Sequence, residues 1–324
     1  MQILEPTEEN IIKASEIIKS GGLVAFPTET VYGLGANGYN PIAAAKIFEA
    51  KGRPKFNPLI LHICDISKIE EISTIKIKSI EKVLNKFFPG PLTIVVPKAE
   101  RVPDIITAGN PTVAIRMPNN KIALELIKYS GVPIAAPSAN KFGKLSPTTA
   151  LHVAKQLKDR IDIVLDGGKS SVGVESTIIE ISGEEVYLLR PGGLSAEVIE
   201  EEIGKKLLKK KTGKNPNAPG QLLYHYAPQK TISFLTEEEL QKNKDKRIGA
   251  LLFSEKFDYF NFAVKKYLTK AEDYREAASN LFFMLHELET ENIDIILAEP
   301  VKEEGLGRAI MDRLKKAVNT FKIK

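Results

Sequence analysis

Residues 51–63 read KGRPKFNPLILHI and connect a predicted helix to a predicted strand. Before them, PIAAAKIFEAKG (41–52) has the apolar spacing of a helix and a proline in its first turn. After the charged residues, LILHI (59–63) is the short apolar run of a buried strand. A helix that leads into a buried strand is the repeating unit of an α/β fold.

Positive charge is concentrated in front of this strand. Lys51, Arg53 and Lys55 are separated only by Gly52 and Pro54. Cationic side chains on both sides of a glycine suit a multiply charged anion held against the backbone. The alternative is a solvated turn, because lysine and arginine are mostly exposed.

The alternation of strands and helices continues on both sides of this stretch, and it predicts a sheet with helices on both faces. Further strands are expected at 23–27, 92–97, 112–118, 133–140, 161–168, 176–181 and 185–192, and further helices at 7–20, 78–88, 120–131, 148–159 and 195–207. The two strands flanking Gly183 are close enough in sequence to form an antiparallel hairpin. The predicted fold is therefore α/β, with a mixed, twisted sheet covered by helices.

Changes of composition divide the chain into three parts. Residues 1–207 are predicted to form the first α/β domain, and residues 208–229 a linker in which lysines give way to prolines and glycine. The pattern restarts at 230 and predicts a smaller, Rossmann-like α/β domain over 230–324. Because the linker also carries leucines and tyrosines, we expect it to fold back over the first domain.

The bulk composition excludes several classes of protein. The chain has 324 residues, 43% hydrophobic and 27% charged, as is typical of a globular protein. With Cys64 as the only cysteine, four histidines and no HExxH motif, we expect no disulfide and no metal held by protein side chains. No apolar run suits a membrane span and no signal sequence is recognisable, so we expect a cytoplasmic protein. The net charge of +5 is compatible with an anionic ligand or RNA and requires neither.

Some residues resemble functional motifs without their context. GLGANG (33–38) fits G-x-G-x-x-G, but TETVY separates it from the preceding strand, whereas a dinucleotide fingerprint follows its strand directly. The stretch GKS (168–170) lacks the first glycine of a P-loop, because Ile163 occupies that position. His152 and His286 lie inside amphipathic helices and are expected to be structural.

Polar residues gather at the ends of predicted strands, where α/β proteins bind their ligands. Arg116 lies inside the apolar run TVAIRMP (112–118), and a buried arginine needs an anionic partner. This partner is either an internal carboxylate, such as Glu29 or Glu175, or a bound ligand. Arg190 poses the same choice.

Two sets of side chains suit two different ligands. The basic and hydroxyl groups that suit a polyphosphate are Lys51, Arg53, Arg190, Ser138 and Ser146. The set that suits a small hydroxylated carboxylate is Arg116, Thr30 and Ser176. The residues therefore predict a nucleotide and a small acid bound side by side.

Several motifs together resemble one enzyme family. They are KGRPKFNPL (51–59), PSAN (137–140), VESTI (174–178) and LRPGG (189–193), with further similarity in TETVYGLG (28–35), PGQLLYHYAP (219–228) and GLGRAIMDRLKKA (305–317). In this order they closely resemble the threonylcarbamoyl-AMP synthase family, whose catalytic domain is called YrdC-like. The resemblance spans the whole chain and matches the long form of the family, which has a C-terminal domain.

This resemblance implies the synthesis of L-threonylcarbamoyladenylate and pyrophosphate from L-threonine, bicarbonate or CO2, and ATP. Mg²⁺ would be bound to the ATP phosphates rather than to protein side chains. The product would serve threonylcarbamoyladenosine formation beside the tRNA anticodon through a separate transferase, so contact with tRNA would be weak. The linker would act as a lid over the site.

The resemblance also implies roles for single residues. Lys51 and Arg53 would be the catalytic cations at the ATP phosphates. The remaining ATP-binding residues would be Asn57, Thr112, Ser138, Asn140, Ser146, Arg190 and, from the linker, Tyr226. L-Threonine would be bound by Thr30, His62, Arg116 and Ser176.

Two other classes of function compete with this interpretation. A basic, concave α/β surface can bind RNA by shape without any catalysis. Carbamoyl transfer in hydrogenase maturation uses the same fold, but within larger proteins whose cysteine-rich segments a chain with one cysteine lacks. The non-catalytic RNA-binding module is therefore the alternative.

Overall fold

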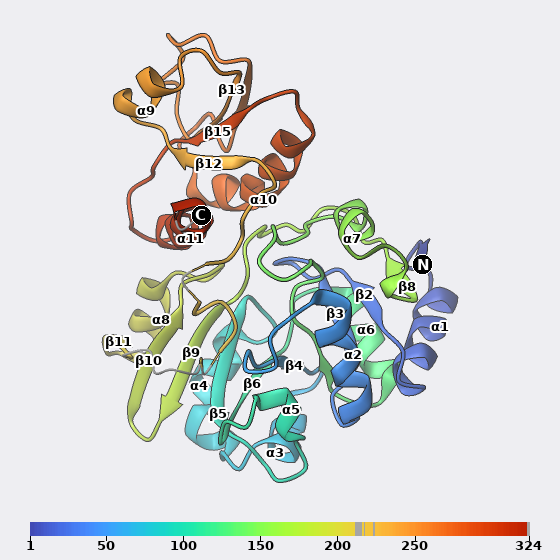
Figure 1. Ribbon diagram of the computed structural model, residues 1–324. Coiled ribbons are helices and arrows are strands. Elements are labelled where there is room, and N and C mark those ends of the chain that lie inside the picture. The colour runs from blue at the N-terminus through green and yellow to red at the C-terminus, as the bar shows by residue number, and fades with distance from the viewer. Residues whose placement is uncertain (211–215, 217, 223, 323–324) are drawn as a thin grey trace.

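The computed structural model describes residues 1–210, 216, 218–222 and 224–322. Residues 211–215, 217 and 223 of the predicted linker, among them Lys211 and Lys214, lie outside the described residues. Two α/β domains are visible in Figure 1, with the smaller C-terminal domain resting on one end of the larger one. No helix within the described ranges is both long and apolar enough to cross a membrane.

Eleven strands of the described chain form the large sheet, in the order β1-β8-β2-β3-β7-β4-β6-β5-β9-β10-β11. They are β1 (Gln2–Leu4), β2 (Val24–Phe26), β3 (Gly33–Asn37), β4 (Ile60–His62), β5 (Leu92–Pro97), β6 (Thr112–Arg116), β7 (Ile134–Ala135), β8 (Ile163–Leu165), β9 (Thr177–Ser182), β10 (Glu185–Arg190) and β11 (Leu208–Lys209). Parallel and antiparallel pairs alternate irregularly, and β9 and β10 form the predicted antiparallel hairpin. The mixed sheet is therefore confirmed.

The prediction misses β1, β3 and β11, and β3 is the glycine-rich stretch itself. Its glycines leave room for the neighbouring strands: a Cβ on Gly35 would lie 2.9 Å from the Phe26 ring and 2.8 Å from Ile134. Close approach of large side chains thus requires the same glycines that weaken the strand signal in the sequence.

Helices cover the large sheet. Those at predicted positions are α1 (Glu8–Lys19), α2 (Pro41–Lys51), α4 (Ile77–Phe87), α6 (Lys121–Ser130), α7 (Ala150–Leu157) and α8 (Ala196–Ile203). The short helices α3 (Ile69–Ile72) and α5 (Asp104–Thr107) and the 3₁₀ turns η1 (Ile66–Lys68) and η2 (Lys158–Arg160) are absent from the prediction. The helix predicted at 195–207 ends earlier, because Gly204 adopts a left-handed conformation with φ 71°.

The ends of α2 determine where the basic residues lie. The Asn40 side chain accepts hydrogen bonds from the amides of Ile42 and Ala43, and Pro41 occupies the first turn. At the other end Gly52 is left-handed with φ 62°, and the Arg53 amide donates to the Phe48 carbonyl at 2.9 Å. This cap reverses the chain, so that Lys51 and Arg53 both enter the interior.

The C-terminal domain has a parallel four-stranded sheet in the order β12-β15-β13-β14. Its elements are β12 (Thr231–Phe234), α9 (Glu237–Lys242), β13 (Ile248–Leu252), β14 (Val264–Tyr267), α10 (Tyr274–Thr290), β15 (Ile295–Ala298) and α11 (Gly307–Lys322). The smaller α/β domain is confirmed.

Helices α10 and α11 lie on the side of the C-terminal domain that faces the large domain (Figure 1). One buried apolar cluster joins the two domains, with Val174 and Tyr226 packed together with Leu281 and Phe282 of α10. At Gly173 the contact is so close that a Cβ would lie 2.4 Å from the Ser279 carbonyl oxygen. The two domains therefore share a core instead of meeting at a loose surface.

Candidate active site

A pocket lies where strand ends of the large sheet meet the linker. It is lined by many of the predicted site residues: Thr30, Arg53, His62, Arg116, Ser138, Ser176, Arg190 and Tyr226. Residues from β4, β6 and β10 thus meet a side chain from the linker. All three residues of the small-acid set line this pocket, together with Arg53, Ser138 and Arg190 of the polyphosphate set.

Lys51 links the basic loop to the PSAN motif behind the pocket wall. Its Nζ donates to the carbonyl oxygen of Ser138 at 2.5 Å and also to that of Asn140. The Ser138 hydroxyl donates to Asn140 Oδ1 at 2.5 Å. Lys51 and Asn140 do not line the pocket themselves, but they fix the loop that brings Ser138 into it.

Arg53 is oriented by its own loop. Its guanidinium donates to Asn57 Oδ1 at 2.7 Å and to the carbonyl oxygens of Asn57 and Pro58 at 3.1 and 2.8 Å. Asn57 therefore orients the Arg53 guanidinium through hydrogen bonds, but does not line the pocket itself.

The buried cations of the phosphate set are not paired with a carboxylate in the described part of the chain. Within the described residues, Lys51, Arg53 and Arg190 form no ion pair, and the hydrogen bonds given above for Lys51 and Arg53 go to carbonyl and amide oxygens. Burial, together with the charge of Arg53, lowers the pKa of the Lys51 amine well below its ordinary value. Because an uncompensated buried charge is costly, the pocket is prepared for an anion.

The sequence allows either an internal carboxylate or a bound ligand as the partner of Arg116, and the structure shows an internal carboxylate, Glu29. Its Nη2 lies 2.8 Å from Glu29 Oε2, both side chains are buried, and Nε donates to the Gly90 carbonyl at 3.3 Å. Arg116 nevertheless lines the pocket, beside His62 on the paired strand β4. Burial and the charge of Arg116 lower the pKa of His62 to about 3, so His62 is neutral.

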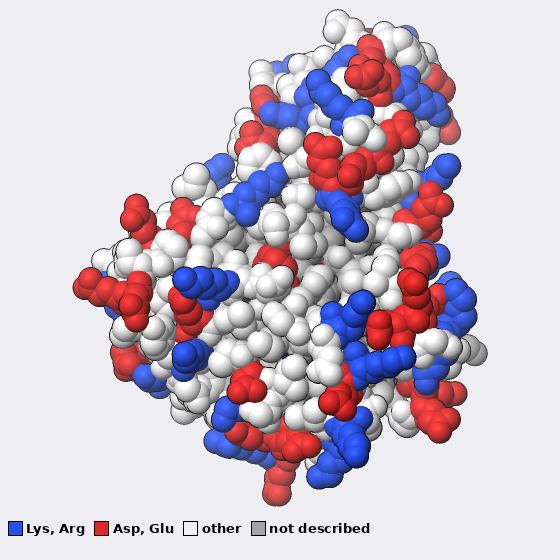
Figure 2. All heavy atoms as spheres, turned by 180° about the vertical axis from the view of Figure 1, so that it is seen from behind, with Lys and Arg blue, Asp and Glu red and all other residues white. Residues whose placement is uncertain are grey.

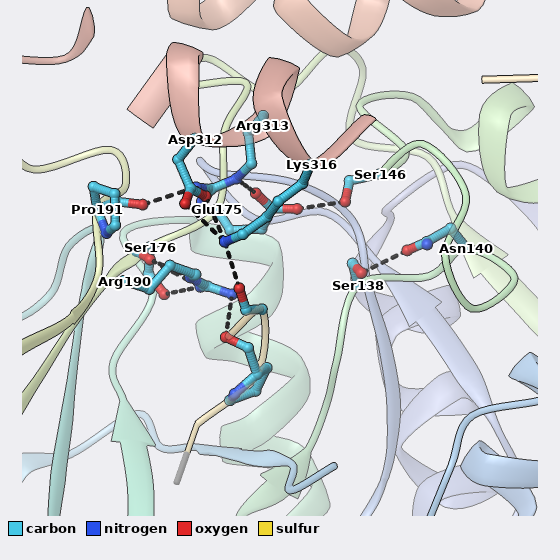
Figure 3. Close-up of polar contacts among 12 residues, drawn as sticks. Ser138, Asn140, Ser146, Glu175, Ser176, Arg190, Pro191, Asp312, Arg313 and Lys316 are labelled. Carbon is cyan, nitrogen blue, oxygen red and sulfur yellow. Dashed lines mark hydrogen bonds and ion pairs between the residues drawn. The ribbon is translucent and has the colours of Figure 1, made fainter. Parts of the chain in front are cut away.

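Arg190 connects the sheet to the linker (Figure 3). Its guanidinium donates to the Ser176 carbonyl at 2.8 and 3.1 Å, to the Ser176 hydroxyl at 3.2 Å, and to the Pro219 carbonyl at 3.2 Å. The Ser176 hydroxyl is also 2.7 Å from that of Thr93. Ser176 is thereby fixed at the pocket, and the linker is fixed above it.

The described part of the linker covers the pocket. Pro219, Gly220, His225 and Tyr226 contribute to the lining. Gly220 has φ +84°, and a Cβ there would lie 2.8 Å from Arg190 Cδ and 2.9 Å from the Tyr226 hydroxyl. Burial lowers the pKa of His225 to about 3 and raises that of Tyr226 to about 12, so both rings are uncharged near neutral pH.

Besides Lys51, Asn57 and Asn140, two further predicted ATP ligands lie outside the pocket lining. Thr112 begins β6, opposite Pro97 of β5, at the other end of the strand from Arg116. Ser146 is fully buried, and its hydroxyl donates to Glu175 Oε1. Ser146 thus reaches the pocket only through the Glu175 carboxylate, which is part of the lining.

The C-terminal domain contributes Arg313 to this network, a residue without a predicted role. Arg313 Nε lies 2.8 Å from Glu175 Oε2, and its Nη1 donates to the Pro191 carbonyl at 2.9 Å (Figure 3). Burial opposes the ionisation of Glu175, but the charges of Arg313 and Arg190 outweigh it and hold its pKa at about 2. The sequence does contain a signal that Arg313 is buried, because helical spacing places it on the same face of α11 as the apolar residues Ile310 and Ala317.

No described group of three or more His, Cys, Asp or Glu side chains is arranged to hold a metal ion. The pocket carboxylate Glu175 is engaged by Ser146 and Arg313, and Glu29 is engaged by Arg116. The charges of this pocket therefore fit an anion better than a free metal cation.

Comparison with known proteins identifies the family. Residues 16–192 match a family described as telomere recombination, and residues 194–318 match one described as threonylcarbamoyl-AMP synthase, C-terminal domain. The chain is 43% identical to the threonylcarbamoyl-AMP synthase of Pyrococcus abyssi over 98% of this chain and 96% of that protein. Its identity to that of Bacillus subtilis is 40%, over 97% and 94%.

A solved structure agrees over the same length. The crystal structure of P. abyssi Sua5 complexed with L-threonine has a TM-score of 0.90 at 42% identity, and covers 98% of this chain and 97% of that one. These findings confirm the resemblance that the motifs indicate. With both domains matched and nearly the full length aligned, the chain belongs to the threonylcarbamoyl-AMP synthase family.

Proposed function

We propose that this pocket is where the reaction of the family takes place. That reaction joins L-threonine, bicarbonate or CO2, and ATP into L-threonylcarbamoyladenylate and pyrophosphate for tRNA modification. One observation carries the assignment: the buried cations Arg53 and Arg190 line one covered pocket beside Arg116, with Lys51 directly behind its Ser138 wall, and within the described residues none of Lys51, Arg53 and Arg190 forms an ion pair. A triphosphate would compensate these charges.

The roles proposed for single residues follow the two charge sets. Lys51, Arg53 and Arg190 would neutralise the phosphates, and Arg116 would bind the threonine carboxylate. Around the nucleotide we place Asn57, Thr112, Ser138, Asn140, Ser146 and Tyr226, and around threonine Thr30, His62 and Ser176. Mg²⁺ would enter with ATP, bound to its phosphates, and would supply further charge neutralisation there.

The chemistry needs no covalent enzyme intermediate. The neutral threonine amine attacks the carbon of CO2, or of bicarbonate with loss of water, and releases one proton to solvent as the carbamate forms. An oxygen of the carbamate then attacks the α-phosphorus. The bond from that phosphorus to pyrophosphate breaks, and pyrophosphate leaves with the electron pair. Positioning and charge neutralisation dominate such a transfer, which is what buried cations provide. Because a carbamate decomposes in water, a linker that covers the pocket protects it.

The partners beyond the small substrates belong to the same proposal. The product would pass to a separate transferase in the cytoplasm, with weak direct contact to tRNA. On the face shown in Figure 2, basic and acidic side chains are interspersed. Neither this face nor the synthase names of the relatives supports the non-catalytic RNA-binding alternative.

The test is pyrophosphate release from Mg-ATP, with threonine and bicarbonate omitted in turn. We expect release only with both, and a decrease of about 100-fold or more in kcat/KM for Lys51→Ala, because a buried donor to the phosphates is lost. Lys141→Ala is the matched control, since this lysine is exposed and follows Asn140 directly. Release that does not depend on threonine would refute the proposal.

A further inference from the structure

We propose that His286, in helix α10 of the C-terminal domain, is a positioning residue for the ATP side of the pocket, because its imidazole holds the loop that carries Ser146. The inference rests on the proposed role of Ser146 at the nucleotide. It gives the C-terminal domain a defined part in nucleotide binding.

The His286 side chain contacts a backbone carbonyl of the large domain. Its Nε2 lies 3.2 Å from the Ser146 carbonyl oxygen, and its Nδ1 lies 3.5 Å from Glu289 Oε2 on the same helix. A carbonyl oxygen only accepts, so Nε2 must be the protonated nitrogen in this contact. The imidazole is 7% exposed, which makes an unsatisfied donor or acceptor costly here.

A second histidine, His152 of the large domain, packs against His286 and contacts the same loop. The His152 ring of α7 stacks on His286 with 3.9 Å between ring centroids and 25° between ring planes. His152 Nδ1 accepts a hydrogen bond from the Thr148 amide at 3.4 Å, which requires this nitrogen to be unprotonated. The stacked pair therefore holds the loop at two points, the Ser146 carbonyl and the Thr148 amide.

Ser146 transmits this contact to the pocket. Its carbonyl is bound by His286 and its hydroxyl donates to Glu175, whose other oxygen is bound by Arg313. Glu175 lines the pocket, so a shift of Ser146 displaces a carboxylate beside the proposed phosphates. Two helices of the C-terminal domain thus contact the same Ser146–Glu175 pair, α10 through His286 and α11 through Arg313.

The experiment compares substitutions in the full-length chain by equilibrium binding of Mg-ATP, measured calorimetrically without threonine. His286→Leu removes the donor at similar volume, and His286→Gln retains an amide donor with nearly the reach of Nε2. Phe283→Leu is the control, because Phe283 packs on His152 at 5.7 Å between centroids in the same interface without touching Ser146. If the leucine variant does not fold, His286→Asn replaces it, since its amide is too short to reach the Ser146 carbonyl.

We expect His286→Leu to weaken ATP binding about fivefold, as the loss of one hydrogen bond predicts. His286→Gln and Phe283→Leu should stay within about twofold of wild type. Unchanged ATP affinity in His286→Leu overturns the inference, and so does equal weakening by Phe283→Leu or failure of glutamine to restore it. Wild-type turnover is measured separately: binding without turnover refutes the proposed reaction alone, whereas absence of ATP binding refutes both.

Discussion

Arg116 and Lys51 show how single buried charges differ within one pocket. Arg116 is compensated by Glu29 at 2.8 Å, whereas Lys51 meets only carbonyl oxygens among the described residues. An arginine that already pairs with a carboxylate can share its guanidinium with a substrate carboxylate at a small cost in free energy. A buried lysine without an ion pair is stabilised by any anion that binds beside it. This difference is why we assign the carboxylate to Arg116 and the phosphates to Lys51.

Arg116→Lys tests the carboxylate assignment. Lysine retains the charge but loses the planar pair of donors, so we expect the KM for threonine to rise about tenfold or more. The affinity for ATP, measured by binding, should change by less than about twofold. Parallel losses for both substrates would show that Arg116 supports the pocket as a whole.

Three buried histidines make stability depend on pH. Burial, the first cause in each case, lowers the pKa of His62, His152 and His225 to about 3, from an ordinary value of 6.5. Between these values the unfolded chain binds more protons than the folded one, so acid favours unfolding. The free energy of unfolding should fall by up to about 1.4 kcal/mol per pH unit for each histidine as the pH decreases below 6.5.

Thermal unfolding from pH 7.5 to 4.5 measures this effect. The window avoids the contribution of Glu175, whose pKa of about 2 means that its stabilisation is lost only below its ordinary value of 4.5. A melting temperature that stays constant across the window would contradict the neutral, buried state of these histidines.

At the scale of elements, the linker is the segment whose conformation matters most for the pocket. Ala218 is fully buried among Ile60, Ala114 and their neighbours, and the Ala227 amide donates to the Gly143 carbonyl at 2.8 Å. Between these two anchors Gly220 passes directly over Arg190 and Tyr226. The linker is therefore seated by specific contacts at both ends of its covering part.

Gly220→Ala should displace the linker from its contacts with Arg190 and Tyr226, and Gly204→Ala is its matched control. Both glycines are left-handed, with φ of 84° and 71°, but only the Cβ of residue 220 would meet other atoms. The shared backbone strain costs about 1–2 kcal/mol in each variant. We expect turnover to fall at least about tenfold in Gly220→Ala alone, with ATP hydrolysis less tightly coupled to product formation.

Product formation and pyrophosphate release, measured together, separate the two effects. Equal turnover in the two glycine variants would indicate that the linker conformation over Arg190 does not contribute to catalysis.

At the scale of the molecule, the two domains are joined by charge as well as by apolar packing. Arg313 is 1% exposed, and with Glu175 it forms an ion pair between the domains at 2.8 Å. Lys316, one turn further along α11, donates to the Gly220 carbonyl at 2.6 Å. Helix α11 thereby contacts both the pocket wall and the linker (Figure 3).

Arg313→Met should lower the free energy of unfolding by about 3–5 kcal/mol, because Glu175 is left charged and buried without its main partner. Arg308→Met is the control: Arg308 lies on the same helix and pairs across the domains with Glu197 at 3.0 Å, but about half exposed, so we expect less than about 1 kcal/mol. Chemical denaturation measures both.

Adding Glu175→Gln to Arg313→Met should restore part of the loss, since the unpaired charge is then gone. Strictly additive effects would contradict a direct coupling between these two residues.

The local sequence was sufficient to predict most of the helices and strands. Helix α2 was predictable because Pro41 starts it and Gly52 follows its last residue directly, and the hairpin β9–β10 because its strands are adjacent in the chain. Strand β3 was missed, since its glycines are explained only by Phe26 and Ile134 on neighbouring strands. The motifs at 51–59 and 137–140 indicated the family, and the structure brings them together through Lys51.

The sequence by itself determined the α/β class, the two domains and the charged residues of the pocket, because periodicity and motifs are properties of neighbouring residues. Only the tertiary structure decided the partners of those charges. It paired Arg116 with Glu29, left Lys51 among carbonyl oxygens, and brought Arg313 to Glu175 and His286 to Ser146, each more than a hundred residues away in the chain. Such pairings depend on how helices and strands pack, and no local pattern of residues encodes the distance between two side chains that far apart.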